Sequence, residues 1–173
     1  AQTAGLGLVV VDAGVDGDED VVGAAVGARP SDPRGDLESA DALTVSDVDA
    51  LLAAGRDVGR RAAQSGLVVL GEIGVGNTTV AAALACALTG LDPAEAVGLG
   101  AGADAAILER KRDVVAAALL RCGPALAGSE SPADQARQAL AGLGGPEIAV
   151  LTGVVLGAVE AGAAIVHLHA RDP

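Results

Sequence analysis

The chain has no Phe, Trp, Tyr or Met among its 173 residues, so Ala, Val, Leu and Ile must build any hydrophobic core. Such a core buries less area per residue than one with aromatic rings. The 25 glycines add backbone entropy that folding has to overcome. We expect residues 1–173 to form a single domain of ordinary size and modest stability.

Basic residues are scarce, because 11 Lys and Arg stand against 23 Asp and Glu, for a formal net charge of −12. Nucleic-acid binding usually needs a basic face, and aromatic side chains for base stacking are absent too. An acidic surface also disfavours anionic membranes. We therefore predict that neither nucleic acid nor a membrane is a partner.

Long apolar runs and cysteine clusters are also missing. The run at residues 148–158 falls short of the roughly 18 residues that a membrane span needs, and the N-terminus lacks the basic segment of a signal peptide. Cys86 and Cys122 lie in helical apolar patterns without metal-type spacing, which is typical of buried, reduced thiols. These features predict a cytoplasmic protein without a cysteine nucleophile.

Expected strands alternate with expected helices along the chain. Apolar runs predict strands at residues 6–11, 67–70 and 163–168, and residues 18–33 are expected to be irregular. Capping residues and apolar periodicity predict helices, the first beginning at Thr44 or Ser46; the helical segments are residues 44–63, 78–88, 91–95, 104–120, a segment opening at 131, and 146–156. The alternation predicts an α/β fold with a parallel sheet.

Residues 70–80 have the order strand, glycine loop, helix, which aims backbone N–H groups at an anion. Their spacing is that of a nucleotide-binding loop, but Asn77 replaces the lysine that nucleotide triphosphatases use, which argues against triphosphate hydrolysis. Loop N–H groups and the hydroxyls of Thr78 and Thr79 could hold a monophosphate. Glu72 instead indicates recognition of a cationic or N–H-bearing group. The alternative is a tight strand–helix turn with threonine as its cap.

Three further clusters each allow two interpretations. Gly98, Gly100 and Gly102 permit close backbone approach to a ligand, and Lys111 could reach a phosphate or carboxylate. Alternatively, the glycines form a plain connection between two helices, and Lys111 is a solvated surface cation.

The other two clusters are Asp12 with Asp16, and His167 with His169. The aspartates could bind a metal or a ligand hydroxyl, or cap their own backbone. The histidines would face one side of a strand and could share a metal, or lie half-exposed.

Taken together, residues 10–18, 71–79, 87–91, 98–111 and 144–149 resemble the nicotinate-nucleotide:5,6-dimethylbenzimidazole phosphoribosyltransferase family over about residues 8–163. The resemblance implies a Rossmann-like parallel sheet with flanking helices, and a homodimer. It implies transfer of ribose 5-phosphate from nicotinate mononucleotide to a benzimidazole-type base, for cobalamin lower-ligand synthesis. No metal or organic cofactor is expected.

The resemblance also implies residue roles. Glu72 would face the ribose or the incoming base, where a carboxylate can stabilise oxocarbenium-like charge or take the azole proton. Lys111 would hold an anionic group of the mononucleotide. The substrate-binding loop would comprise Gly74, Gly76, Asn77, Thr78 and Thr79.

The chain also departs from the family, whose members are about twice as long. It resembles their middle portion and has no counterpart to the C-terminal glutamate that accepts the proton in the family. A non-catalytic nucleotide-binding module is therefore an alternative. A second alternative is a zinc-dependent carbon–carbon lyase that uses His167 and His169, because the terminal strand is similar to the zinc-binding strand of β-keto acid cleavage enzymes.

Overall fold

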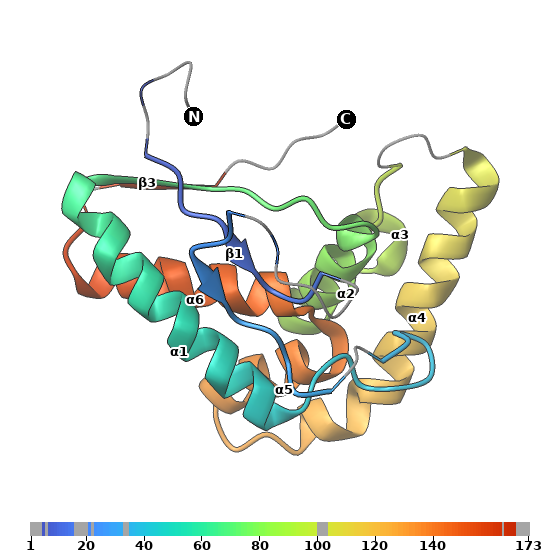
Figure 1. Cartoon of the computed structure of the whole chain (residues 1–173). Coiled ribbons are helices and arrows are strands. Elements are labelled where there is room, and N and C mark those ends of the chain that lie inside the picture. The colour runs from blue at the N-terminus through green and yellow to red at the C-terminus, as the bar shows by residue number, and fades with distance from the viewer. Residues whose placement is uncertain are drawn as a thin grey trace.

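The computed structural model describes residues 5, 7–15, 21, 23–32, 35–99, 104–163 and 165–168 (Figure 1). Helices hold most of these residues, and the strands are short. In chain order the elements are β1 (Val11–Asp12), β2 (Val26–Gly27), α1 (Val45–Ala62), the 3-10 turn η2 (Ala63–Ser65), β3 (Leu67–Leu70), α2 (Asn77–Thr89), α3 (Pro93–Ala96), α4 (Ala105–Ala127), α5 (Pro132–Leu143), α6 (Pro146–Glu160) and β4 (Ile165–Leu168).

The strands form two parallel pairs, which confirms the predicted α/β class with parallel pairing. β1 pairs with β2, and β3 pairs with β4 in a register that sets Val69 opposite His167. The strand expected over residues 6–11 is present only as β1, because β2 offers a parallel partner of two residues. β2 lies in a segment that the sequence predicts to be irregular, so that prediction was wrong at Val26 and Gly27.

Local capping signals set most of the helix boundaries. Thr44 caps α1 and forms a capping box with Asp47, while the side chains of Asp104 and Ser131 cap α4 and α5. α2 begins differently, after Gly76 with φ of 84° and without a side-chain cap. α4 runs to Ala127, past the predicted end near residue 120, because its exposed Pro124 is accommodated within the helix.

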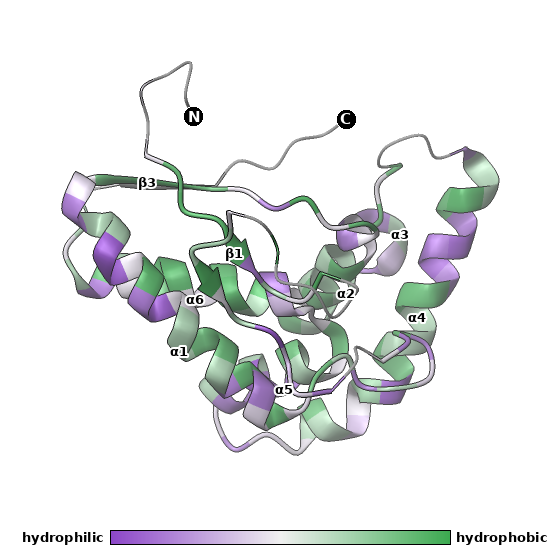
Figure 2. Cartoon of the chain, viewed as in Figure 1, coloured by the Kyte–Doolittle hydropathy of each residue, from purple (hydrophilic) through white to green (hydrophobic). Residues whose placement is uncertain are grey.

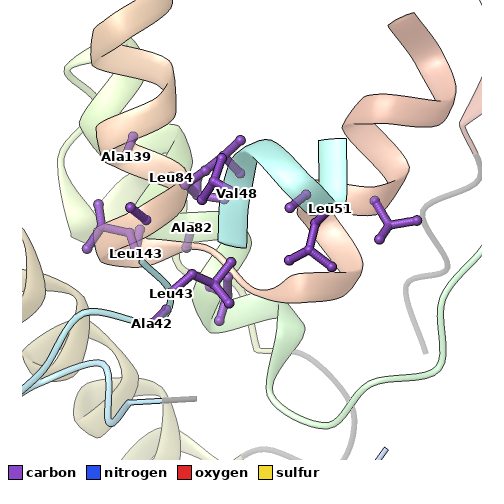
Figure 3. Close-up of a cluster of buried hydrophobic side chains, with 14 of the residues drawn as sticks. Ala42, Leu43, Val48, Leu51, Ala82, Leu84, Ala139 and Leu143 are labelled. Atoms are coloured by element: carbon purple, nitrogen blue, oxygen red, sulfur yellow. The ribbon is translucent and has the colours of Figure 1, made fainter. Parts of the chain in front are cut away.

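The core consists of aliphatic side chains from several helices, as the composition requires. Val48 and Leu51 of α1, Leu84 of α2 and Leu143 of α5 belong to one buried cluster, together with small residues such as Ala82 and Ala139 (Figure 3). Hydropathy colouring shows polar residues along α1 and a largely apolar α6 beside it (Figure 2). No helix in the described ranges is long and apolar enough to cross a membrane.

Four glycines let α1 and α6 pack with their backbones in contact. Gly55 and Gly59 lie one turn apart on α1, and Gly153 and Gly157 do the same on α6. A methyl group added at any of the four would come closer than 3.0 Å to a backbone atom of the opposite helix. α1 also contacts β3, which leads into the glycine loop, and α6 contacts β4.

Asp47 fastens the start of α1 to the preceding segment. Its Oδ1 accepts from the backbone N–H of Ser31 at 2.8 Å and from the Ser31 hydroxyl at 2.7 Å, and its Oδ2 accepts from the Thr44 hydroxyl at 2.6 Å. The Ser31 N–H, followed by the two hydroxyls, lowers the pKa of the Asp47 carboxyl from 3.8 to about 2.

Asp47→Asn is expected to lower the free energy of unfolding at pH 7 by about 2 kcal/mol, because the lowered pKa reports stabilisation of the charged form. This stabilisation is fully present above about pH 4 and is lost as the pH falls through 2. In urea unfolding, the difference in the free energy of unfolding between parent and variant should therefore shrink as the pH falls from about 4 to 2. Asp113→Asn, at an exposed aspartate of α4, is the control. A gap that stays constant between pH 7 and pH 2 would contradict the assignment.

Candidate functional site

The carboxylate of Glu72 lies in the loop between β3 and α2 and is bonded to the loop and to the first residue of α2. Its Oε2 accepts from the backbone N–H of Gly74 at 2.6 Å and from Nδ2 of Asn77. The Gly74 N–H, expected from the sequence to serve an anionic ligand, is thus engaged by the chain's own carboxylate. Two donors therefore hold one oxygen of this carboxylate.

Asn77 is the first residue of α2, and only 8% of its surface is exposed. Its Nδ2 faces Glu72, whereas its Oδ1 is buried and has no hydrogen-bond partner among the described residues. Gly74 makes room for this side chain, because a methyl group at Gly74 would overlap the Asn77 amide.

Lys111 approaches the same helical turn from α4. Asp104 caps α4 by accepting from Ile107 N–H at 2.9 Å, and Lys111 lies two turns further on. The Lys111 Nζ donates to the hydroxyl of Thr78 at 3.3 Å and to the carbonyl of Leu99 at 3.2 Å. Both acceptors are uncharged, so the ammonium charge is available to an anionic ligand.

Two adjacent residues in the first turn of α2 contact groups of opposite charge. Asn77 holds the Glu72 carboxylate, and Thr78 contacts the Lys111 ammonium. Gly76, the N-cap, contributes no side-chain acceptor, so the positive end of the helix dipole lies beside the loop and favours an anion. Thr79, also predicted for the loop, continues this turn with its N–H bonded to the Gly76 carbonyl at 3.0 Å.

A shallow, mainly apolar pocket of about 400 Å³ opens beside Thr78. Its remaining walls come from α2, α3 and the segments next to α3; they are Ala81, Ala82, Ala85, Leu91, Ala96 and Gly98. A planar ring could lie against such a surface while an anionic group on the same ligand reached Lys111.

Asp12 lies at the end of β1 and is buried in contacts with its own chain. Its Oδ1 accepts from the N–H groups of Gly14 and Val15, each at 3.0 Å, and its Oδ2 is paired with Arg29 at 2.7 Å. The two backbone N–H groups, with Arg29, hold the pKa of this carboxyl below its usual value against the effect of burial. The geometry matches the turn-capping interpretation of Asp12.

Several residues named from the sequence lie outside the described residues: Asp16, Gly100, Gly102, His169 and the side chain of His167. Within the described ranges, no group of three or more His, Cys, Asp or Glu could hold a metal ion. Cys86 and Cys122 are buried free thiols, and burial raises the pKa of both, which keeps them protonated and unreactive.

Two contacts of the site were not predicted from the sequence. The carbonyl of Leu99 binds Lys111 through a backbone atom that every residue type possesses. The family resemblance implies a substrate-binding role for Asn77, whereas in the structure its side chain contacts Glu72. Only the five-residue separation of Glu72 and Asn77 across a tight glycine turn could have indicated it.

Comparisons with known proteins agree on one family. A family model described as phosphoribosyltransferase matches residues 1–167. The nicotinate-nucleotide–dimethylbenzimidazole phosphoribosyltransferase of Solidesulfovibrio magneticus is 40% identical over 91% of this chain and 44% of its own length. The enzyme of that name from Bradyrhizobium diazoefficiens is 38% identical over 92% of this chain and 44% of its own.

A solved structure gives the same result. The crystal structure of CobT from Thermus thermophilus superposes with a TM-score of 0.77 at 36% identity, and the match covers 93% of this chain and 46% of that one. The chain therefore spans less than half the length of the relatives it matches. On the family match and these similarities, the chain belongs to the nicotinate-nucleotide–dimethylbenzimidazole phosphoribosyltransferase family.

Proposed function

We propose that this chain binds nicotinate mononucleotide and transfers its ribose 5-phosphate to a benzimidazole-type base. The observation that carries the proposal is the first turn of α2, which holds the Glu72 carboxylate through Asn77 and the Lys111 ammonium through Thr78. A ligand with a phosphate and a reacting ribosyl carbon needs both charges within one site. The similarity to enzymes named for this reaction supports the assignment.

In this proposal Lys111, the Thr78 hydroxyl and the N-terminus of α2 hold an anionic group of the mononucleotide. The bond between the ribose carbon and the nicotinate nitrogen breaks, and its electron pair neutralises the pyridinium. An azole nitrogen forms the new bond to that carbon. Glu72 stabilises the positive charge that develops on the ribose, and a carboxylate of this kind can also take the azole proton. The steps need no metal or organic cofactor.

The reaction is tested by following free nicotinate chromatographically after adding nicotinate mononucleotide, with and without 5,6-dimethylbenzimidazole. We expect release that depends on the base and forms the ribosylated azole in equal amount. Glu72→Gln should lower the rate by about 10-fold to 100-fold, because the charge that stabilises the transition state is removed. Saturable binding of the mononucleotide without base-dependent release would identify a non-catalytic binding module and contradict the transferase proposal.

We further propose that the chain forms a homodimer in the cytoplasm. Leu67 and Val69 on β3, together with Ile73 and Val75 in the glycine loop, expose apolar side chains next to the site, and exposed patches of this kind favour association. The free thiols Cys86 and Cys122 fit a reducing compartment. Light scattering on the purified chain should give twice the monomer mass, and a monomer at all concentrations would refute the dimer.

A further inference from the structure

We propose that Asn77 is a positioning residue that fixes the Glu72 carboxylate, and that it does not itself contact the substrate. The proposal rests on the function proposed above, because it takes Glu72 as the group that acts on the ribose or the azole. The family resemblance assigns Asn77 to the substrate-binding loop, whereas the side chain of Asn77 contacts Glu72.

Two donors converge on one oxygen of Glu72. Asn77 Nδ2 and the Gly74 N–H, at 2.6 Å, both bind Oε2. Within the described part of the chain, no donor is bonded to Oε1, and the residue as a whole is exposed. Because both donors bind Oε2, Oε1 is the oxygen that can accept from an azole N–H or a ribose hydroxyl or face a developing positive charge.

The contact with Glu72 allows the Asn77 amide only one orientation. Rotating the amide by half a turn would bring Oδ1 against Oε2 of Glu72, which would set two acceptors face to face. The orientation that Glu72 requires leaves Oδ1 buried without a partner in the described ranges, and this costs free energy. An apolar side chain would avoid that cost, so a role in stability alone does not explain an asparagine here.

Gly74 belongs to the same arrangement. A methyl group at Gly74 would overlap the Asn77 amide, whereas a methyl group at Gly71 would meet no atom within 4 Å. Gly74→Ala should therefore displace Asn77 and reproduce the effect of Asn77→Ala. Gly71→Ala is the matched control for an added methyl group in the same loop.

The first readout needs no ligand. In amide NMR of the free protein, the Gly74 N–H and the Asn77 side-chain NH₂ should exchange slowly with solvent. Glu72→Ala should speed up exchange of both, Asn77→Ala should shift the Gly74 resonance, and Gly71→Ala should leave them as in the parent. If Glu72→Ala changes neither signal, Asn77 does not hold Glu72 and the proposal is overturned, whatever the activity.

The second readout is turnover. Asn77→Ala and Gly74→Ala should lower kcat for nicotinate release about 10-fold to 100-fold. They should change KM for the mononucleotide less than about 2-fold, because the Lys111–Thr78 contact remains. Glu72→Ala and the Glu72→Ala/Asn77→Ala double variant should have the same kcat, since Asn77 acts through Glu72. Losses that multiply in the double variant, or a KM effect without a kcat effect, would overturn the proposal.

The Tm of each variant is measured by thermal unfolding alongside the NMR and turnover experiments. Asn77→Ala is expected to keep its Tm within a few degrees of the parent, because it removes a bond and an unpaired buried oxygen together. If the parent releases no nicotinate but shows the NMR coupling, the proposed function fails and the contact between Asn77 and Glu72 stands. If the parent is active and the coupling is absent, the positioning proposal fails alone.

Discussion

Gly157→Ala is expected to lower the free energy of unfolding by about 3 kcal/mol or more, the largest loss of stability that we predict for a single methyl group. The added Cβ would lie closer than 3.0 Å to the backbone carbonyl of Arg56 on α1. Backbone atoms within a helix cannot rotate away as the end of a side chain can, so α1 and α6 would have to separate.

The measurement is urea unfolding of Gly157→Ala beside Gly123→Ala. Gly123 also lies inside a helix, α4, but a methyl group there meets no atom within 4 Å. The control should stay within about 1 kcal/mol of the parent, since only helix propensity changes. Equal effects at the two positions would show that α1 and α6 do not pack through their glycines.

Lys111→Met is expected to weaken binding of nicotinate mononucleotide about 10-fold to 100-fold, which is the range for one lost hydrogen bond between charged groups. Methionine retains most of the aliphatic chain and removes the ammonium group. The loss of affinity is expected because, among the described residues, Lys111 donates only to two uncharged acceptors, the Thr78 hydroxyl and the Leu99 carbonyl. No carboxylate therefore neutralises its ammonium group in these contacts, and the charge can attract an anionic ligand.

Arg110→Met is the matched control for this prediction. Arg110 precedes Lys111 on α4, is exposed, and carries the same charge, so its removal changes the net charge equally. Affinity should fall much less in Arg110→Met than in Lys111→Met, because screened long-range attraction is weak. Similar losses in both variants, measured by calorimetric titration at about 0.15 M salt, would mean that Lys111 contributes only general electrostatics.

Local signals in the sequence predicted much of the fold. Thr44, Asp104 and Ser131 carry side chains that cap a helix in their own neighbourhood, and each does so here. The close contact of α1 with α6 depends instead on glycines from distant parts of the chain. Arg121 likewise binds Asp41 and the carbonyl of Gly142, and no local pattern indicates such pairings.

In the candidate site, too, some contacts were predicted from the sequence and others were not. The family resemblance assigned Lys111 and Thr78 to one substrate, and the structure brings them together across 33 residues. The spacing of the loop did not show that Glu72 would take the Gly74 N–H and the Asn77 amide. A glycine loop can wrap around a ligand or around its own side chain, and only the three-dimensional path of the loop distinguishes these outcomes.

Binding of nicotinate mononucleotide by the purified chain is best measured by calorimetric titration. We expect saturable binding at one site per chain with a Kd at or below about 1 mM, the upper end of common substrate affinities. Binding should also raise the Tm of the parent and be weakened strongly in Lys111→Met. An absence of saturable heat, with an unchanged Tm at the highest mononucleotide concentration, would show that this chain does not bind the mononucleotide.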